Sequence, residues 1–298
     1  MDTLNQGVAL NCSRRGFLVL AGIGLNTAGA VAHSFEGVTA RQVIERIQKN
    51  VGVPWRTETV DTFKIGSPET IVKGIATSFS ATLDVCQRAH AQGMNLLIVH
   101  EPTFYNHLDE TANLSGEIYQ TKRNFIEKNG LVVWRFHDHW HARKPDGILS
   151  GMAGALGWEK NQSREQPRLF SLPAATLEEI AQNIQRRLNA RALRVIGDPR
   201  LTVRRVFLSP GFNNFPGMMK ALDSPDVDLL VIGETREWEG VEYARDCVTA
   251  GKKKGLIVIG HVPSEERGME ECAKWLKTFV TEVPIQYLPG GDPFWRPK

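Results

Sequence analysis

The sequence contains few cysteines, and their spacing is not that of a thiolate metal site. Of the four, Cys12 lies in an amino-terminal stretch discussed below, which leaves Cys86, Cys247 and Cys272 in the rest of the chain. Because three is an odd number, at most one disulfide can form within this part of the chain, and nothing in the sequence requires it. Cys86 and Cys272 fall within helical patterns and are therefore expected to be buried apolar side chains.

The chain also has only a small excess of charge of one sign. The 298 residues include 36 Lys and Arg and 33 Asp and Glu, which gives a formal net charge of +3. So small an excess is not typical of proteins that bind nucleic acids or acidic membranes, and we expect no nucleic-acid partner. Hydrophobic residues make up 42% of the chain, which is enough for a sizeable core in one large or two medium-sized domains.

The stretch that comes nearest to a membrane span follows an arginine pair, Arg14–Arg15, and is short and only weakly hydrophobic. It is rich in Gly and Ala and ends in the small residues AVA, which is typical of a cleavable export signal. The arginine pair is typical of a bacterial twin-arginine signal, a route that exports folded proteins. We therefore expect a signal over residues 1–32, cleavage near Ala32, no stable membrane anchor, and a periplasmic or secreted mature chain of residues 33–298.

Apolar strands alternate with amphipathic helices along the mature chain, which predicts an α/β fold with mostly parallel sheet covered by helices. We expect strands at 71–78, within 95–102, and at 131–136, 203–208, 227–232 and 256–259, with 283–288 as an edge strand. We expect helices at 39–50, 81–92, 115–128, 149–156, 177–188, 215–222, 240–250 and 266–279. Thr39 and Thr176 are the expected caps of two of these helices. Residues 160–175 are polar and contain prolines, so they are the best boundary between a first lobe of about 33–160 and a second of about 176–298, with interleaving of the lobes left open.

Residues 256–266 read LIVIGHVPSEE. The four apolar residues predict a buried parallel strand, which ends near His261. Pro263 and Ser264 suit the first positions of a helix, and within a helix His261 and Glu265 share one face because they are four residues apart. A neutral imidazole beside a carboxylate makes half of a divalent-metal site. The alternative for this stretch alone is a buried histidine beside a helix-capping glutamate.

Two further predicted strands also end in histidines. Residues 95–102 read NLLIVHEP, and residues 131–136 run into the sequence HDHWHAR. Ligands of open α/β sheets lie beyond the carboxyl ends of the strands, so three strands that deliver histidines there predict a shared site. Six of the eight histidines lie at or near these three strand ends. Beyond His261, the side chains concerned are His100, Glu101, His107, His137, Asp138, His139 and His141.

The HEP at His100–Pro102, the GE at Gly233–Glu234 and the GHVPSE at Gly260–Glu265 resemble motifs of the NIF-three-like family (NGG-one-interacting factor three). Bacterial members of that family are often labelled GTP cyclohydrolase type-two homologues. The resemblance extends over nearly all of the mature chain. It implies a two-lobed α/β fold with a dinuclear metal centre in the cleft between the lobes, and a homo-oligomer, commonly a ring-shaped hexamer. An exported protein rarely meets GTP, so we do not transfer that substrate to this chain.

The chain departs from the family pattern at two ligand positions, which makes it a divergent, HEP-containing subtype. Glu101 stands where the family has a second histidine, and a carboxylate ligand favours harder metals. His141 stands where the family has an aspartate, four residues after His137. Asp138 is the nearest alternative carboxylate, although strand alternation would point it away from His137 and His139. The resemblance thus implies two divalent ions, of Zn, Mn or Fe, that share a bridging carboxylate. The implied ligands are His100, Glu101, His141, His261 and Glu265, with Asp138 as the alternative to His141.

Two adjacent divalent ions can activate a water molecule, so the leading hypothesis is a metal-dependent hydrolase of a small phosphorylated or heterocyclic or amide substrate. His137 or His139 is the expected general acid or base. Glu234 either orients a ligand or water molecule or caps a helix. Three cationic residues flank the histidine cluster and either attract an anionic substrate or lie on solvated surface. They are Arg135, Arg143 and Lys144. The alternative function is a non-catalytic metal-binding or partner-recruiting ring protein, which would bind its partners without turnover.

Overall fold

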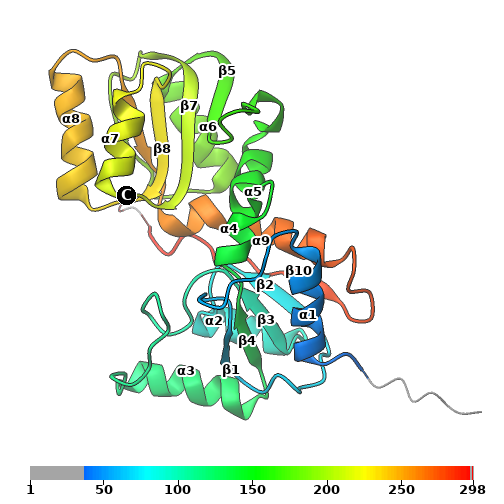
Figure 1. The fold of residues 1–298 in the computed structure, drawn as a ribbon. Coiled ribbons are helices and arrows are strands. Elements are labelled where there is room, and N and C mark those ends of the chain that lie inside the picture. The colour runs from blue at the N-terminus through cyan, green and yellow to red at the C-terminus, as the bar shows by residue number, and fades with distance from the viewer. Residues whose placement is uncertain (1–36, 296, 298) are drawn as a thin grey trace, which may run out of the picture. The chain divides into compact units, whose positions relative to one another are not determined.

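The computed structural model describes residues 37–295 and residue 297, and its strands form two five-stranded sheets (Figure 1). The expected export signal, with Arg14–Arg15, Cys12 and the cleavage point near Ala32, lies outside these residues. Helices pack against both sheets. The predicted α/β class is confirmed; the first sheet is mostly parallel as expected, whereas the second has two parallel and two antiparallel strand pairs.

The first sheet has the strand order β1-β4-β3-β2-β10. Its strands are β1 (Phe63–Ile65), β2 (Ile75–Ser78), β3 (Leu96–Val99), β4 (Val132–Arg135) and β10 (Ile285–Tyr287). All neighbours are parallel except β1, which runs antiparallel to β4. Every residue of β2, β3 and β4 is buried, as expected for parallel strands that are covered on both faces. The edge strand expected at 283–288 is β10, and it pairs with β2, so the chain returns to its first sheet after completing the second.

The second sheet has the strand order β5-β7-β8-β9-β6. Its strands are β5 (Leu169–Thr176), β6 (Arg194–Ile196), β7 (Thr202–Phe212), β8 (Leu229–Glu234) and β9 (Gly255–Val258). The three central strands are parallel, and the two edge strands are antiparallel to them. Much of the segment 160–175, interpreted from its polar composition as a boundary, is the edge strand β5. The polar residues of the segment precede this strand, which reads LFSLPAAT. Pro173 is tolerated within it because an edge strand is paired on one side only.

Nine α-helices connect these strands within the described residues. They are α1 (Ala40–Asn50), α2 (Leu83–Ala91), α3 (Glu117–Lys128), α4 (Asp138–Ala142), α5 (Gly147–Leu156), α6 (Leu177–Leu188), α7 (Phe215–Asp223), α8 (Glu242–Thr249) and α9 (His261–Leu276). A 3-10 turn (Glu159–Asn161) follows α5 and a π-helical turn (Glu237–Val241) precedes α8. Thr39 and Thr176 cap α1 and α6 as predicted, each in a capping box. Across residues 37–295, no helix combines the length and the apolar character that crossing a membrane requires.

Helix α9 contacts both sheets, through β2 and β10 of the first and β7 and β8 of the second. It begins at His261, earlier than the start predicted at 266. The early start is possible because the first backbone N–H groups of a helix have no intrahelical partner, so Pro263 loses nothing in the first turn. Helix α5 packs closely against α9 where Gly151 faces Gly268. A Cβ atom on Gly151 would lie 2.4 Å from the backbone oxygen of Arg267 and 2.6 Å from Gly268 Cα.

This close packing predicts opposite effects for two substitutions on one helix. Gly151→Ala is expected to lower the free energy of unfolding by about 1–3 kcal/mol, because the neighbouring backbone of α9 must move. Gly154→Ala, three residues along α5, meets its nearest atom at 3.4 Å and is expected to be neutral or to stabilise by up to about 1 kcal/mol through helix propensity. Urea denaturation of the two variants measures the difference, and equal stabilities would contradict the close approach of α5 and α9.

Candidate metal centre

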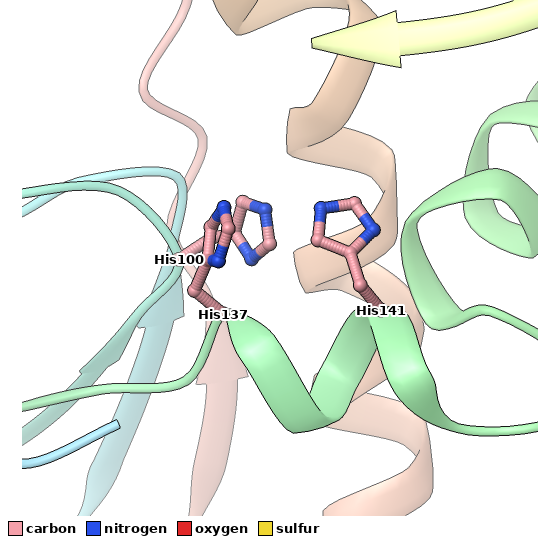
Figure 2. Close-up of side chains that lie close together, drawn as sticks. All are labelled: His100, His137 and His141. Carbon is pink, nitrogen blue, oxygen red and sulfur yellow. The ribbon is translucent and has the colours of Figure 1, made fainter. Parts of the chain in front are cut away.

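The ends of four parallel strands deliver the side chains of the predicted site. His100 and Glu101 follow β3, and β4 leads through Phe136 into α4, which carries His141. His261 and Glu265 lie in the first turns of α9, directly after β9, and Glu234 ends β8. Figure 2 shows the imidazoles of His100, His137 and His141 directed into one space, with His137 and His141 at the two ends of α4.

The potential ligand atoms lie close enough together to hold metal ions. Those of His100, His137 and His141 are all within 4.8 Å of one another, and so are those of His100, Glu101 and Glu265. His261 joins the second group, because its Nε2 lies 3.1 Å from Glu265 Oε2 and 3.4 Å from Glu101 Oε1. The contact of His261 with Glu265 confirms that the two share one helical face. The structure thus brings together the five ligands implied by the sequence and adds His137.

Each of four histidines is oriented by a hydrogen bond from Nδ1 to an oxygen atom. The acceptors are Phe136 O for His100 (3.1 Å), Asp138 Oδ1 for His137 (3.0 Å), Asp146 Oδ2 for His141 (3.1 Å) and Glu234 Oε1 for His261 (3.0 Å). Carbonyl and carboxylate oxygens only accept, so Nδ1 carries the proton in every case. The Nε2 atom of each neutral ring is then left with its lone pair, as in histidines that bind metals through Nε2.

These Nε2 atoms face the carboxylates of Glu101 and Glu265. His100 Nε2 is 3.4 Å from Glu265 Oε2, is completely buried and has no hydrogen-bond partner. His141 Nε2 is 4.0 Å from Glu265 Oε1, and His137 Nε2 is 3.7 Å from Glu101 Oε1. A buried lone pair that faces a carboxylate oxygen is unfavourable unless a cation lies between the two. The donor set of imidazole nitrogen and carboxylate oxygen therefore fits a divalent metal ion.

The charges around the site agree with this interpretation. Burial holds the pKa of His100 well below its ordinary value, so the ring is neutral and can donate its lone pair. Burial also lowers the pKa of His137. For His261 burial acts in the same direction, but hydrogen bonds to Glu101, Glu234 and Glu265 outweigh it and raise the pKa to about 12. The three carboxylates thus favour a positive charge at His261, and a bound metal ion would supply that charge in place of the second proton of the ring.

Helix α4 exists because a carboxylate caps it from a distant part of the chain. Asp61 Oδ1 accepts the backbone N–H groups of His137 (2.6 Å) and Asp138 (2.9 Å), and Oδ2 accepts that of His139 (2.9 Å). An anionic cap at a helix N-terminus is strongly favourable. The strand alternation assumed for HDHWHAR is therefore wrong: the segment is helical, and His137 and His141 share one face.

The helix turns His139 and Asp138 away from the ligand groups. His139 is completely buried; its Nδ1 donates to Asp61 (2.7 Å), and its Nε2 accepts the N–H of Arg56 (3.0 Å). With both ring nitrogens engaged, His139 holds the loop before β1 against α4. Asp138 belongs to neither ligand group and accepts hydrogen bonds from Thr59 (2.8 Å) and from His137. Its carboxylate orients His137.

The three cations that flank the cluster in the sequence have different environments. Arg135 is completely buried rather than solvated: its Nε donates to His100 O (2.9 Å), and its Nη2 lies 3.1 Å from Glu101 Oε2. It therefore holds Glu101 so that only Oε1 faces the imidazoles. Arg143 lies over the rings of Trp140 and Trp275. Lys144 alone of the three lines the cleft described next.

The ligand groups open into a cleft of about 1260 Å³. Glu101, His137, His141, His261 and Glu265 line one part of it. Strand β7 approaches the cluster so closely that a Cβ atom on Gly211 would lie 2.1 Å from Glu265 Oε1. The backbone N–H of Gly211 also donates to Ser264 Oγ (3.0 Å), so the end of β7 is held against the first turns of α9.

Sequence reasoning missed several residues of the site. Asp146 caps α5 through Ile148 N (2.9 Å) and also orients His141, and the capping pattern before GIL would have found it. Asp61 and Arg135 had no local signal, because their partners lie far away in the sequence. The three cysteines of the described residues, Cys86, Cys247 and Cys272, are buried and free, as expected for two of them.

The Duf34/NIF3 (NGG1p interacting factor 3) family matches residues 30–289 of the chain. Among solved structures, the hypothetical protein SA1388 of Staphylococcus aureus is similar with a TM-score of 0.70 and 18% identity, over 88% of this chain and 100% of that one. A Bacillus cereus protein related to NIF3 has a TM-score of 0.69 at 15% identity, over 86% and 98%. Reduced HcgD from Methanocaldococcus jannaschii has a TM-score of 0.58 at 14% identity, over 84% and 98%. At such identities the likeness concerns the fold. No curated protein matches the sequence significantly.

The contact of Gly211 with Glu265 gives a prediction with a closely matched control. Gly211→Ala places a methyl group against the Glu265 carboxylate and is expected to reduce the metal content per chain. Gly93 has the same φ of +73° but nothing within 4 Å of an added Cβ, so Gly93→Ala bears the same left-handed strain of about 1–2 kcal/mol and should keep its metal. Elemental analysis of the two purified variants compares them, and equal metal contents would contradict a ligand role for Glu265.

Proposed function

The chain belongs to the Duf34/NIF3 family, and from this premise we propose that it is a metal-dependent hydrolase with a dinuclear centre, acting on a small phosphorylated or heterocyclic or amide substrate. The observation that carries the proposal is the orphaned Nε2 of His100, buried 3.4 Å from Glu265 Oε2. A cluster that needed no cation would not direct imidazole lone pairs at carboxylates.

Glu265 is the proposed bridging ligand. Its Oε1 faces His141 at 4.0 Å, and its Oε2 faces His100 at 3.4 Å and His261 at 3.1 Å. We assign His100 and His141 to one ion and Glu101 and His261 to the other, with Glu265 shared. Two divalent ions at this site would activate a water molecule for attack and polarise the bond that it attacks.

His137 is the proposed general acid or base. It lines the cleft. Its Nδ1 donates to Asp138 Oδ1 at an N···O distance of 3.0 Å, so its Nε2 is left free to take or give a proton. Glu234 acts on the ligand His261, which it orients through Nδ1. We further propose that the protein acts as an exported homo-oligomer, on the strength of the arginine pair and the family resemblance.

Elemental analysis of the signal-cleaved protein tests the metal centre. The wild type is expected to bind about two equivalents of Zn, Mn or Fe per chain, and His261→Ala and Glu265→Ala are expected to lose metal while circular dichroism shows an intact fold. His90→Ala is the control, because His90 packs against Phe125 away from the cluster. A wild type that takes up no metal from any of these ions would overturn the proposal, and bound metal without turnover of any substrate would favour the binding-protein alternative.

His137→Gln separates a proton-transfer role from a ligand role. Because His137 also belongs to the group with His100 and His141, both roles are chemically open to it. For a general acid or base, we expect unchanged metal content and a kcat for a chromogenic phosphoester lowered about 10²–10⁴-fold. Loss of metal in this variant would make His137 a ligand and contradict the assigned role.

A further inference from the structure

The cleft beside the metal centre carries cations that have no carboxylate partner. Lys144, Arg168 and Lys220 line it, and among the described residues none of the three lies within 4.0 Å of a carboxylate oxygen. The carboxylates that line the same cleft, those of Glu101, Asp146 and Glu265, all face histidines of the cluster. The carboxylates of the cleft are therefore engaged by the histidines, and none of them neutralises Lys144, Arg168 or Lys220.

Arg168 is held in place at both its backbone and its side chain. It directly precedes β5, and its carbonyl oxygen accepts the N–H of Leu208 at 2.8 Å. Its Nη1 donates to the hydroxyl of Ser209 at 2.8 Å, and Ser209 is only 2% exposed. A guanidinium group has five N–H donors in a planar fork, so most of them remain available. Arg168 is exposed, and the contact with Ser209 anchors one side of its guanidinium group while the rest of the fork stays open for bidentate recognition of an anion.

Arg168 also lies at the same cleft as the cluster. Arg168, His141 and Glu265 all line it. Ser209, which holds the guanidinium, is two residues before Gly211, which touches Glu265. One segment of β7 thus connects the cation to the metal centre, and one small molecule can contact both.

We propose that Arg168, together with Lys144 and Lys220 of the same cleft, binds a phosphate group of the substrate while the bond to be hydrolysed lies at the metal cluster. This inference rests on the proposed hydrolase function and narrows its substrate class. A phosphate monoester carries a charge of about −1.5 to −2 at pH 7, which matches a site with more than one cation. The cleft of about 1260 Å³ is large enough for a whole small molecule. Its lining also includes Leu149, Phe207 and Met218, which suit an apolar or aromatic portion of that molecule.

Phenyl phosphate is the probe for this site, because it combines a phosphate with an aromatic ring. Isothermal titration calorimetry measures its binding to the full mature chain, both loaded with Zn and stripped of metal by a chelator. Arg168→Gln is expected to raise the dissociation constant about tenfold or more in both forms. Arg168→Lys keeps the charge but not the fork, so the loss should be smaller. Arg164→Gln is the matched control, because Arg164 is exposed on the same segment and does not line the cleft.

The two metal states separate this inference from the function on which it rests. Equal affinity in the wild type and Arg168→Gln overturns the phosphate site, and so does binding that requires metal and is unaffected by Arg168→Gln. A wild type that takes up no metal but binds phenyl phosphate through Arg168 overturns the metal centre and supports the phosphate site. Unchanged thermal unfolding of Arg168→Gln relative to Arg164→Gln shows that the variant is folded.

Discussion

The structure of the site depends on one unfavourable arrangement, in which buried imidazole lone pairs are directed at carboxylate oxygens. His100 Nε2 and Glu265 Oε2 are 3.4 Å apart, and His100 Nε2 has no hydrogen-bond partner. The ring of His100 cannot turn away, because the carbonyl of Phe136 accepts its Nδ1–H. The charged ring of His261, 3.1 Å from the same Glu265 oxygen, offsets part of the repulsion. A cation between the two groups turns the repulsion into coordination. The fold therefore holds the ligand groups rigidly in an arrangement that is favourable only with positive charge among them.

That rigidity comes from a layer of residues that never touch the centre. Asp61 caps the helix that presents His137 and His141, Asp146 orients one of these rings, and Arg135 restrains Glu101. Each of these contacts is a charge-assisted hydrogen bond, the stronger class in proteins. Because they come from elements on different parts of the sheet, no single segment determines the geometry of the site.

The parts of the site that were predictable from the sequence are those determined by local patterns. The pattern of an apolar strand followed by a histidine predicted that His100 and His261 belong to the site. The spacing of four residues predicted the contact of His261 with Glu265, which the structure confirms at 3.1 Å. The five-residue helix α4 was missed because its cap, Asp61, is 76 residues before His137. Arg135 was expected either to attract an anionic substrate or to lie in solvent, and it does neither, because its burial follows from partners more than 30 residues away. The edge strand β5 was missed because the polar residues 160–168 before it and Pro173 within it resemble a linker.

The return of the chain to its first sheet has a consequence for the order of folding. Strand β10 (Ile285–Tyr287) covers the edge of β2, more than 200 residues earlier, and Asp292 then binds the backbone of Arg191 at 2.7 Å. A ribosome-bound chain that lacks these residues leaves the edge of β2 open to other strands. Pairings between such distant segments also form slowly. The first sheet is therefore completed only after β10 has been synthesised, so the strand ends that carry His100 and Glu101 reach their final arrangement late in synthesis.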